Sequence, residues 1–188
     1  MCSLVRLLFF TFVEKDNISG STDMNSSIDI TYLTLACMCC GVAIVGSFMP
    51  RRATSLVAYC AMIFATMSGA ASFGVYTYIF WGIAVLITIG INYMLPREVA
   101  CSRAGLPFIA GGSLTGTAVG MATATSAGII SGAALGAFFG ALAFANTPGG
   151  RAMTFPSAKF FNYLAAKGLP VIVTLSLAGI ILTLILAR

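Results

Sequence analysis

Charged residues in this chain are few, and they lie in short stretches that separate long uncharged runs. The runs cover residues 30–50, 53–96, 104–150 and 168–187. A helix needs about 20 apolar residues to cross the hydrocarbon core of a bilayer. Because backbone groups inside that core must be satisfied within the segment, the runs predict helices. By their lengths, the four runs have room for one, two, two and one membrane-spanning helices, in chain order.

The composition excludes the other broad classes of protein. Charged residues make up 8% of the chain and hydrophobic residues 59%, whereas a soluble domain carries about 25% charged residues. Extended disorder needs low hydrophobicity and high charge. We therefore expect an all-α, polytopic transmembrane bundle with a single membrane domain over residues 30–188 and spans at about 30–49, 54–72, 76–95, 106–122, 127–146 and 169–187.

Residues 1–29 form a separate segment, apolar at first and then polar. No convincing cleavage site of a signal peptide follows the apolar part. One interpretation is that residues 1–23 are an extension from an upstream start codon and that Met24 is the start. The other is an ordered segment at the membrane interface.

Basic residues predict the orientation of the spans. Positive charge favours the cytoplasmic side of a membrane. With six spans, three connections share one side and hold seven of the chain's ten lysines and arginines: Arg51, Arg52, Arg97, Arg103, Arg151, Lys159 and Lys167. We therefore expect a multi-pass protein of the bacterial inner membrane with both termini outside.

A run of glycines at intervals of four is the most specific pattern. It comprises Gly112, Gly116, Gly120, Gly128, Gly132, Gly136 and Gly140, with Ala124 at the missing position. Residues four apart share a helix face, and strips of small residues let helix backbones approach closely. The pattern predicts helix packing through a glycine zipper.

The run is too long for one span. From Gly112 to Gly140 it covers roughly 43 Å of helix at 1.5 Å per residue, more than the ~30 Å hydrocarbon core. We expect a break within residues 121–127, where Thr123, Thr125 and Ser126 satisfy backbone groups. One interpretation is a structural helix hairpin, and the other is a pore or substrate path lined by glycine backbone.

Residues 147–168 have a pattern of their own. A turn at 147–150 precedes a short helix with Ser157 as its cap and Gly168 at its end. Its aromatic residues, with a lysine near each end, predict an interfacial helix on the inner leaflet. The alternative is that the last span begins one or two turns earlier.

The polar side chains offer little chemistry. The chain has no histidine, the usual proton carrier at neutral pH and the commonest metal ligand. Four of the six cysteines lie in apolar runs, where we expect them to pack as small hydrophobes. None of the expected spans holds an ionisable residue, and Asn92 is expected to bond across helices. We therefore predict no enzymatic activity, no cofactor and no metal.

The segment GAALGAFFG, from Gly132 to Gly140, carries a family resemblance. Together with the order of spans around it, it resembles a family of small bacterial integral membrane proteins that is classed as a domain of unknown function. The resemblance covers about 30–188. That family has no established activity, so the resemblance implies a membrane fold with a glycine-zipper helix pair but no mechanism and no site residue.

The expected function is structural or assembly-related, through packing or self-association along the glycine strips. The expected partners are the lipid bilayer and a homo-oligomer or other membrane subunits, and no nucleic acid is expected. The alternative is a small permease or channel for a neutral solute. A lytic pore is a third interpretation, although such chains are usually shorter.

Overall fold

The structure is a computed structural model that describes residues 24–49, 54–94, 104–150 and 155–186. All regular structure in these ranges is helical, which confirms the expected all-α class. In chain order the helices are α2 (Met24–Gly46), α3 (Thr54–Met67), α4 (Val75–Met94), α6 (Leu106–Met121), α7 (Ser126–Ala145), α8 (Ala158–Tyr163), the π-helix η2 (Leu164–Gly168) and α9 (Leu169–Leu186).

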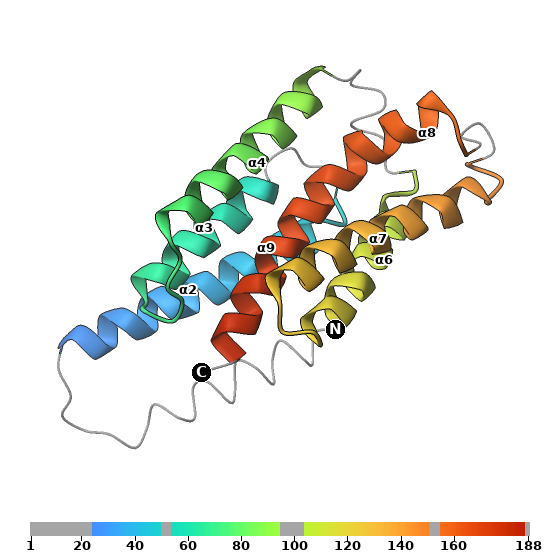
Figure 1. The fold of residues 1–188 in the computed structure, drawn as a ribbon. Helices are drawn as coiled ribbons and strands as arrows, with labels where there is room; N and C mark the ends of the chain where they lie inside the picture. Colours follow the sequence, from blue (N-terminus) through green and yellow to red (C-terminus); the bar gives the residue numbers. More distant parts are fainter. Residues whose placement is uncertain (1–23, 50–53, 95–103, 151–154, 187–188) are drawn as a thin grey trace.

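From α2 to α8 each helix runs opposite to the one before it, and α8, η2 and α9 follow one another in the same direction, so that the helix ends gather at the two ends of the bundle (Figure 1). The end of α2 meets the start of α3, where a Cβ on Gly46 would lie 2.7 Å from Cγ2 of Thr54. Side-chain caps begin two of the later helices. Thr125 accepts a hydrogen bond from the backbone of α7, and Ser157 accepts one from that of α8.

Helix α9 lies in the middle of the bundle, between α2, α3 and α4 on one side and the α6–α7 pair on the other (Figure 1). Val173, Leu177 and Ile181 recur every four residues and pack into a cluster with α2, α3 and α4. Val171 and Leu175 pack into a second cluster with α6, α7 and α8. Because α9 is apolar all round, it buries two faces at once.

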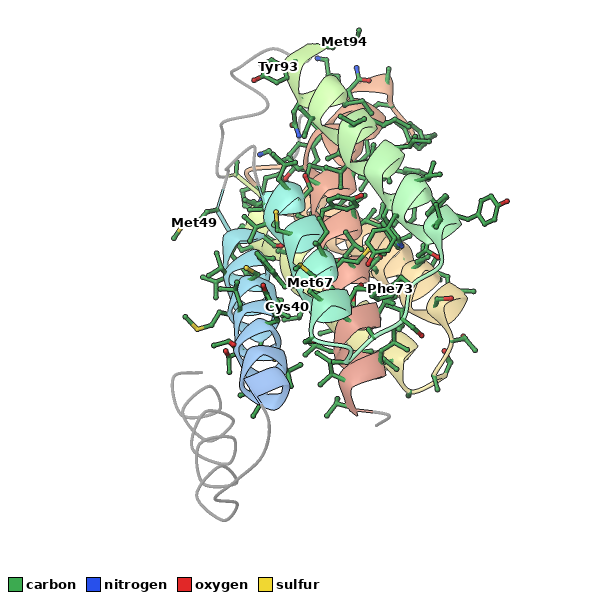
Figure 2. The ribbon with its side chains drawn as sticks, turned by 90° about the vertical axis from the view of Figure 1, so that its left-hand side faces the viewer. Cys40, Met49, Met67, Phe73, Tyr93 and Met94 are labelled. Atoms are coloured by element: carbon green, nitrogen blue, oxygen red, sulfur yellow. The ribbon has the colours of Figure 1, made fainter. Side chains whose placement is uncertain are left out.

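Large apolar side chains cover the outside of the bundle. On α4 they include Val75, Ile79, Ile83 and Leu86, all more than half exposed, and Tyr93 and Met94 project from its tip (Figure 2). Soluble monomers rarely expose contiguous apolar surface on this scale. Three helices are long and apolar enough to cross a membrane, Val75–Met94, Ser126–Ala145 and Ala158–Leu186. The chain therefore has the composition and surface of a membrane protein.

Three further apolar helices are shorter, at Ile30–Gly46, Thr54–Met67 and Leu106–Met121. Together the six apolar helices occupy the six ranges in which the uncharged runs predict spans. Helix positions follow from the sequence pattern, whereas the crossing of a bilayer by each helix stays a prediction.

The last helix differs from its prediction. It runs from Ala158 through η2 to Leu186 without a break, so the short helix expected before Gly168 is not separate from the last span. The last helix therefore starts eleven residues earlier than the expected residue 169, further than the one or two turns of the alternative, and an interfacial position for this part stays a prediction. The physical reason lies at Pro170, which has no N–H and whose ring clashes with the carbonyl four residues earlier in an α-helix. That carbonyl belongs to Ala166, inside the π-helix. The wider π turn accommodates the proline without ending the helix.

Candidate functional site

The glycines that are spaced four residues apart lie on α6 and α7, and the glycines of one helix face those of the other. A Cβ on Gly116 would overlap the carbonyl oxygen of Gly132 and would lie 3.1 Å from Cα of Gly136. A Cβ on Gly112 would overlap the carbonyl oxygen of Gly136 and lie 3.2 Å from Cα of Gly140. The backbones of the two helices therefore touch along these positions, with no space for a side chain between them.

The contact is reciprocal, because glycines of α7 meet the backbone of α6 in the same way. A Cβ on Gly132 would overlap the carbonyl oxygen of Gly116, and one on Gly140 would lie 3.0 Å from Cα of Ile109. Gly111, one residue before Gly112, has nothing within 4 Å of its Cβ position. The close approach is therefore a property of one face of α6.

The connection between α6 and α7 lies where the pattern predicts a break. α6 ends at Met121 and α7 begins at Ser126. Thr123 donates a hydrogen bond to the carbonyl of Gly120, at 2.7 Å, and Thr125 accepts one from the N–H of Gly128, at 3.2 Å. Ala124 does not extend the glycine strip, because it lies in this turn with a positive φ of 52°.

A second candidate site lies at the start of α6, where two side chains from the last helix meet one carbonyl. Tyr163 donates its hydroxyl to the carbonyl oxygen of Ala104 at 2.7 Å, and Nζ of Lys167 donates to the same oxygen at 2.8 Å. Nζ also lies 4.8 Å from the centre of the Tyr163 ring, a cation–π distance. Both side chains are buried.

Glycine and aromatic packing complete this site. Gly105 has a positive φ of 73°, and a Cβ there would overlap the Tyr163 hydroxyl and lie 2.5 Å from the Phe144 ring. The rings of Phe144 and Tyr163 stack with centroids 5.7 Å apart. The backbone therefore turns into α6 at Gly105, directly beneath the tyrosine. The donors fix the end of the α6–α7 hairpin to the last helix.

Lys167 lies in surroundings that the sequence did not predict. It was expected in a cytoplasmic connection, near the end of an interfacial helix. It is 4% exposed and lies inside the continuous helix Ala158–Leu186, because η2 carries the chain through Gly168 and turns Lys167 towards Ala104. Its role in topology stays a prediction. A buried ionisable residue in a membrane helix, in a π-helical turn, is a frequent mark of a functional position.

The other basic residues divide into two groups. Lys159 is exposed on α8, and its role in topology stays a prediction. Five lie outside the described residues, and their role in topology stays a prediction: Arg51, Arg52, Arg97, Arg103 and Arg151.

Asn92 is buried, but its Nδ2 donates to the carbonyl of Thr88 in the same helix, at 3.1 Å. The expected bond across helices is therefore wrong. The amide reaches a backbone acceptor one turn earlier, which satisfies it without a partner helix.

The cysteines of the described helices are free thiols in different surroundings. Cys40 is buried in the cluster that joins α2 and α3, as expected of a packing residue. Cys37 and Cys60 are exposed on the outside of the bundle. Cys2 and Cys101 lie outside the described residues.

No protein-family model, curated protein or solved structure matches this chain. The resemblance to the bacterial family of unknown function therefore stays a prediction, and the sites above are interpreted from their own geometry.

Sequence reasoning missed the pairing of Tyr163 with Lys167, although a signal was present. The two residues are four apart in an apolar stretch, which places them on one helix face. Pro170 follows at the distance at which a proline perturbs the carbonyl of Ala166. The acceptor, the carbonyl of Ala104, lies in the turn before α6, far away in the sequence, and has no signature in the sequence.

Proposed function

We propose that the chain is a six-span membrane protein with a structural or assembly role and no enzymatic activity. The observation that carries the proposal is the contact between the backbones of α6 and α7 at their glycines. A strip that cannot hold a Cβ has no room for a solute. The contact supports a glycine zipper with a structural purpose, and it argues against a path lined by glycine.

The membrane location is supported by aromatic residues at the two ends of α4. Tyr76 is 88% exposed and Tyr93 is 73% exposed. They are 17 positions apart, about 26 Å along a helix, and tyrosine is enriched at the two interfaces of a membrane. The spacing is close to the thickness of the hydrocarbon core, ~30 Å, and fits a helix that crosses once.

The orientation follows from the ends of the helices. The sequences that join α2 to α3, α4 to α6 and α7 to α8 contain five arginines, and these helices end and begin at the same end of the bundle (Figure 1). Lys159 lies at that end as well. The positive-inside rule makes this end cytoplasmic and places both termini outside.

Because the glycine strips of one chain cover each other, self-association would use a different surface. The exposed apolar faces of α2 and α4 are available for lipid or for other membrane subunits. The assembly role therefore concerns the outside of the bundle, with the hairpin as its rigid part.

A small permease or channel for a neutral solute is the second candidate. The observation in its favour is Lys167, buried in a π-helical turn that connects the two packed halves of the last helix. Such positions often take part in ion or substrate pathways.

Purified protein in liposomes separates the two functions. We expect the release of entrapped glycerol or urea to equal that of protein-free liposomes. Native mass spectrometry of the protein extracted in lipid particles should then show a stable oligomer or a stoichiometric membrane partner. Solute release above the protein-free rate, abolished by Lys167→Met, would instead establish the permease. A monomer without flux and without a partner contradicts both.

A further inference from the structure

Two buried serines in the middle of the bundle have hydroxyls without a hydrogen-bond partner, Ser113 of α6 and Ser176 of α9, and both are 0% exposed. A third such hydroxyl, that of Ser55, lies in the first turn of α3. The other buried serines and threonines of the described ranges donate to a carbonyl three or four residues earlier: Ser47, Ser68, Thr88, Thr117 and Thr174. Ser113 and Ser176 therefore do not use the acceptor that their own helices offer.

Two contacts set the register of α6 against α9, which run in the same direction. Nζ of Lys167 donates to the carbonyl oxygen of Ala104, 63 positions earlier. A Cβ on Gly179 would lie 2.7 Å from Cγ2 of Thr117, a residue 62 positions earlier. The two serines differ by 63 positions, so the register places them at the same level of the bundle.

The two serines also lie on faces that meet. Ser113 is one turn before Thr117 on the same face of α6, and its Cα would lie 3.1 Å from a Cβ on Gly136 of α7. Ser176 is about one turn before Gly179, which faces both Thr117 and α7. Both hydroxyls therefore lie near the junction of α6, α7 and α9, and they do not bond to each other.

The junction is lined by small side chains. The buried residues of α7 nearest this level are Ala133 and Ala137, both 0% exposed. Ser176 is near the middle of α9, which has 18 residues. Two polar oxygens among alanines fit a ligand that is small and can both donate and accept hydrogen bonds.

We propose that Ser113 and Ser176 bind one water molecule between α6 and α9. A buried polar group is costly unless it is hydrogen-bonded, and buried waters typically make about three hydrogen bonds to such groups. One water bonds to both hydroxyls and donates to the second lone pair of a nearby helix carbonyl. It joins the α6–α7 hairpin to α9 at mid-height, as the Ala104 contact joins them at one end, and it is compatible with either proposed function.

Unfolding of alanine variants tests the shared ligand. We expect Ser113→Ala and Ser176→Ala each to raise the equilibrium constant of unfolding about five-fold, because each loses the water and leaves the other hydroxyl unpaired. The double variant should raise it no more than either single variant, since the two residues act through one ligand. The control is Ser131→Ala, an exposed serine of α7, which should change the constant less than about two-fold.

Solid-state NMR of the full chain in lipid bilayers detects the water directly. With carbon-13 in serine and threonine, polarisation transferred from water should reach Cβ of Ser113 and Ser176. The matched control is Thr174, which is equally buried two residues away but donates to the carbonyl of Pro170 at 2.7 Å. It should receive clearly less, and Ser176→Ala should remove the transfer to Ser113.

The two measurements can each overturn the proposal. Stabilisation by the single variants would mean that the hydroxyls are buried without a ligand, and additive destabilisation would mean that they bond to separate partners. Transfer to the two serines no greater than to Thr174, or transfer to Ser113 that survives Ser176→Ala, also overturns it. None of these outcomes bears on liposome flux or oligomeric state, so the proposed function stands or falls separately.

Discussion

Tyr163 and Lys167 place two buried donors on one acceptor, the carbonyl of Ala104. In an apolar environment a buried polar group is costly unless it is hydrogen-bonded, so each donor is stabilised by reaching this oxygen. Gly105 makes the arrangement possible, because any side chain there would occupy the place of the tyrosine hydroxyl. These contacts fix the start of α6 against the last helix.

Tyr163→Phe removes one of the two hydrogen bonds and leaves the ring stacked on Phe144. We expect the free energy of unfolding to fall by about 1 kcal/mol, the net value of a typical hydrogen bond. Reversible unfolding in mixed micelles measures the change. The matched control is Tyr76→Phe, whose hydroxyl is exposed and whose loss should change nothing. Equal effects of the two variants would show that the bond to Ala104 does not stabilise the fold.

Gly116 and Gly111 lie on the same helix but differ in what faces them. Gly111→Ala should stabilise the protein by about 1 kcal/mol, because alanine favours helix over glycine. Gly116→Ala should destabilise it by about 2 kcal/mol or more, because its Cβ displaces the backbone of α7. Unfolding of both variants in the same detergent measures the two changes in the free energy of unfolding, which should have opposite signs. Stabilisation by both would exclude a close contact between α6 and α7.

The hairpin of α6 and α7 depends on a short turn as well as on glycine. Thr123 and Thr125 satisfy backbone groups at the two helix ends, and Ala124 adopts a left-handed conformation between them. That conformation costs an alanine roughly 1–2 kcal/mol. The turn is therefore strained at one residue, and the glycine contacts of the helices hold it in place.

Ala124→Gly should relieve this strain and raise the free energy of unfolding by about 1 kcal/mol. The matched control is Ala127→Gly, at the second residue of α7, which should lower it by up to about 1 kcal/mol because glycine disfavours helix. Thermal unfolding of both variants and of the parent protein shows whether each substitution raises or lowers the stability. A loss of stability in Ala124→Gly would mean that the turn does not hold Ala124 at positive φ.

The whole molecule is built around α9, which joins two packed groups of helices. Val173, Leu177 and Ile181 serve one group, and Val171 and Leu175 serve the other. Large apolar side chains cover much of the outside of the described helices. Most contacts between the two groups pass through α9, so its position determines how the halves of the bundle sit together.

The proposed orientation places the C-terminus outside, which a fusion protein can test. Alkaline phosphatase fused after Arg188 should be active in a bacterial host, because it folds only outside the cytoplasm, and a fluorescent protein at the same place should stay dark. A matched fusion within residues 147–150, at the basic end, should give the reverse pattern. Fluorescence of the C-terminal fusion would reverse the orientation or remove one span.

Much of the helical arrangement was predictable from charge and glycine spacing. The uncharged runs predicted the positions of six apolar helices. The glycines spaced four residues apart predicted the break between α6 and α7, before Ser126. These features are local, because a helix period, a turn and a missing charge are each defined within a few residues. Asn92 was misjudged for a related reason. Its nearest acceptor, the carbonyl of Thr88, lay in its own helix.

By itself, the sequence determined that the chain is apolar, helical and divided into runs long enough for a bilayer. Only the tertiary structure decided that Lys167 is buried, that the last helix starts at Ala158, and that the glycine strips of α6 and α7 cover each other. Two of these depend on a group from a distant part of the chain: the Ala104 carbonyl for Lys167, and the facing backbone for each glycine. The third depends on the π-helix η2, which accommodates Pro170 and lets the helix from Ala158 continue. Periodicity places a residue on a face of its helix, and only packing brings the facing group to it.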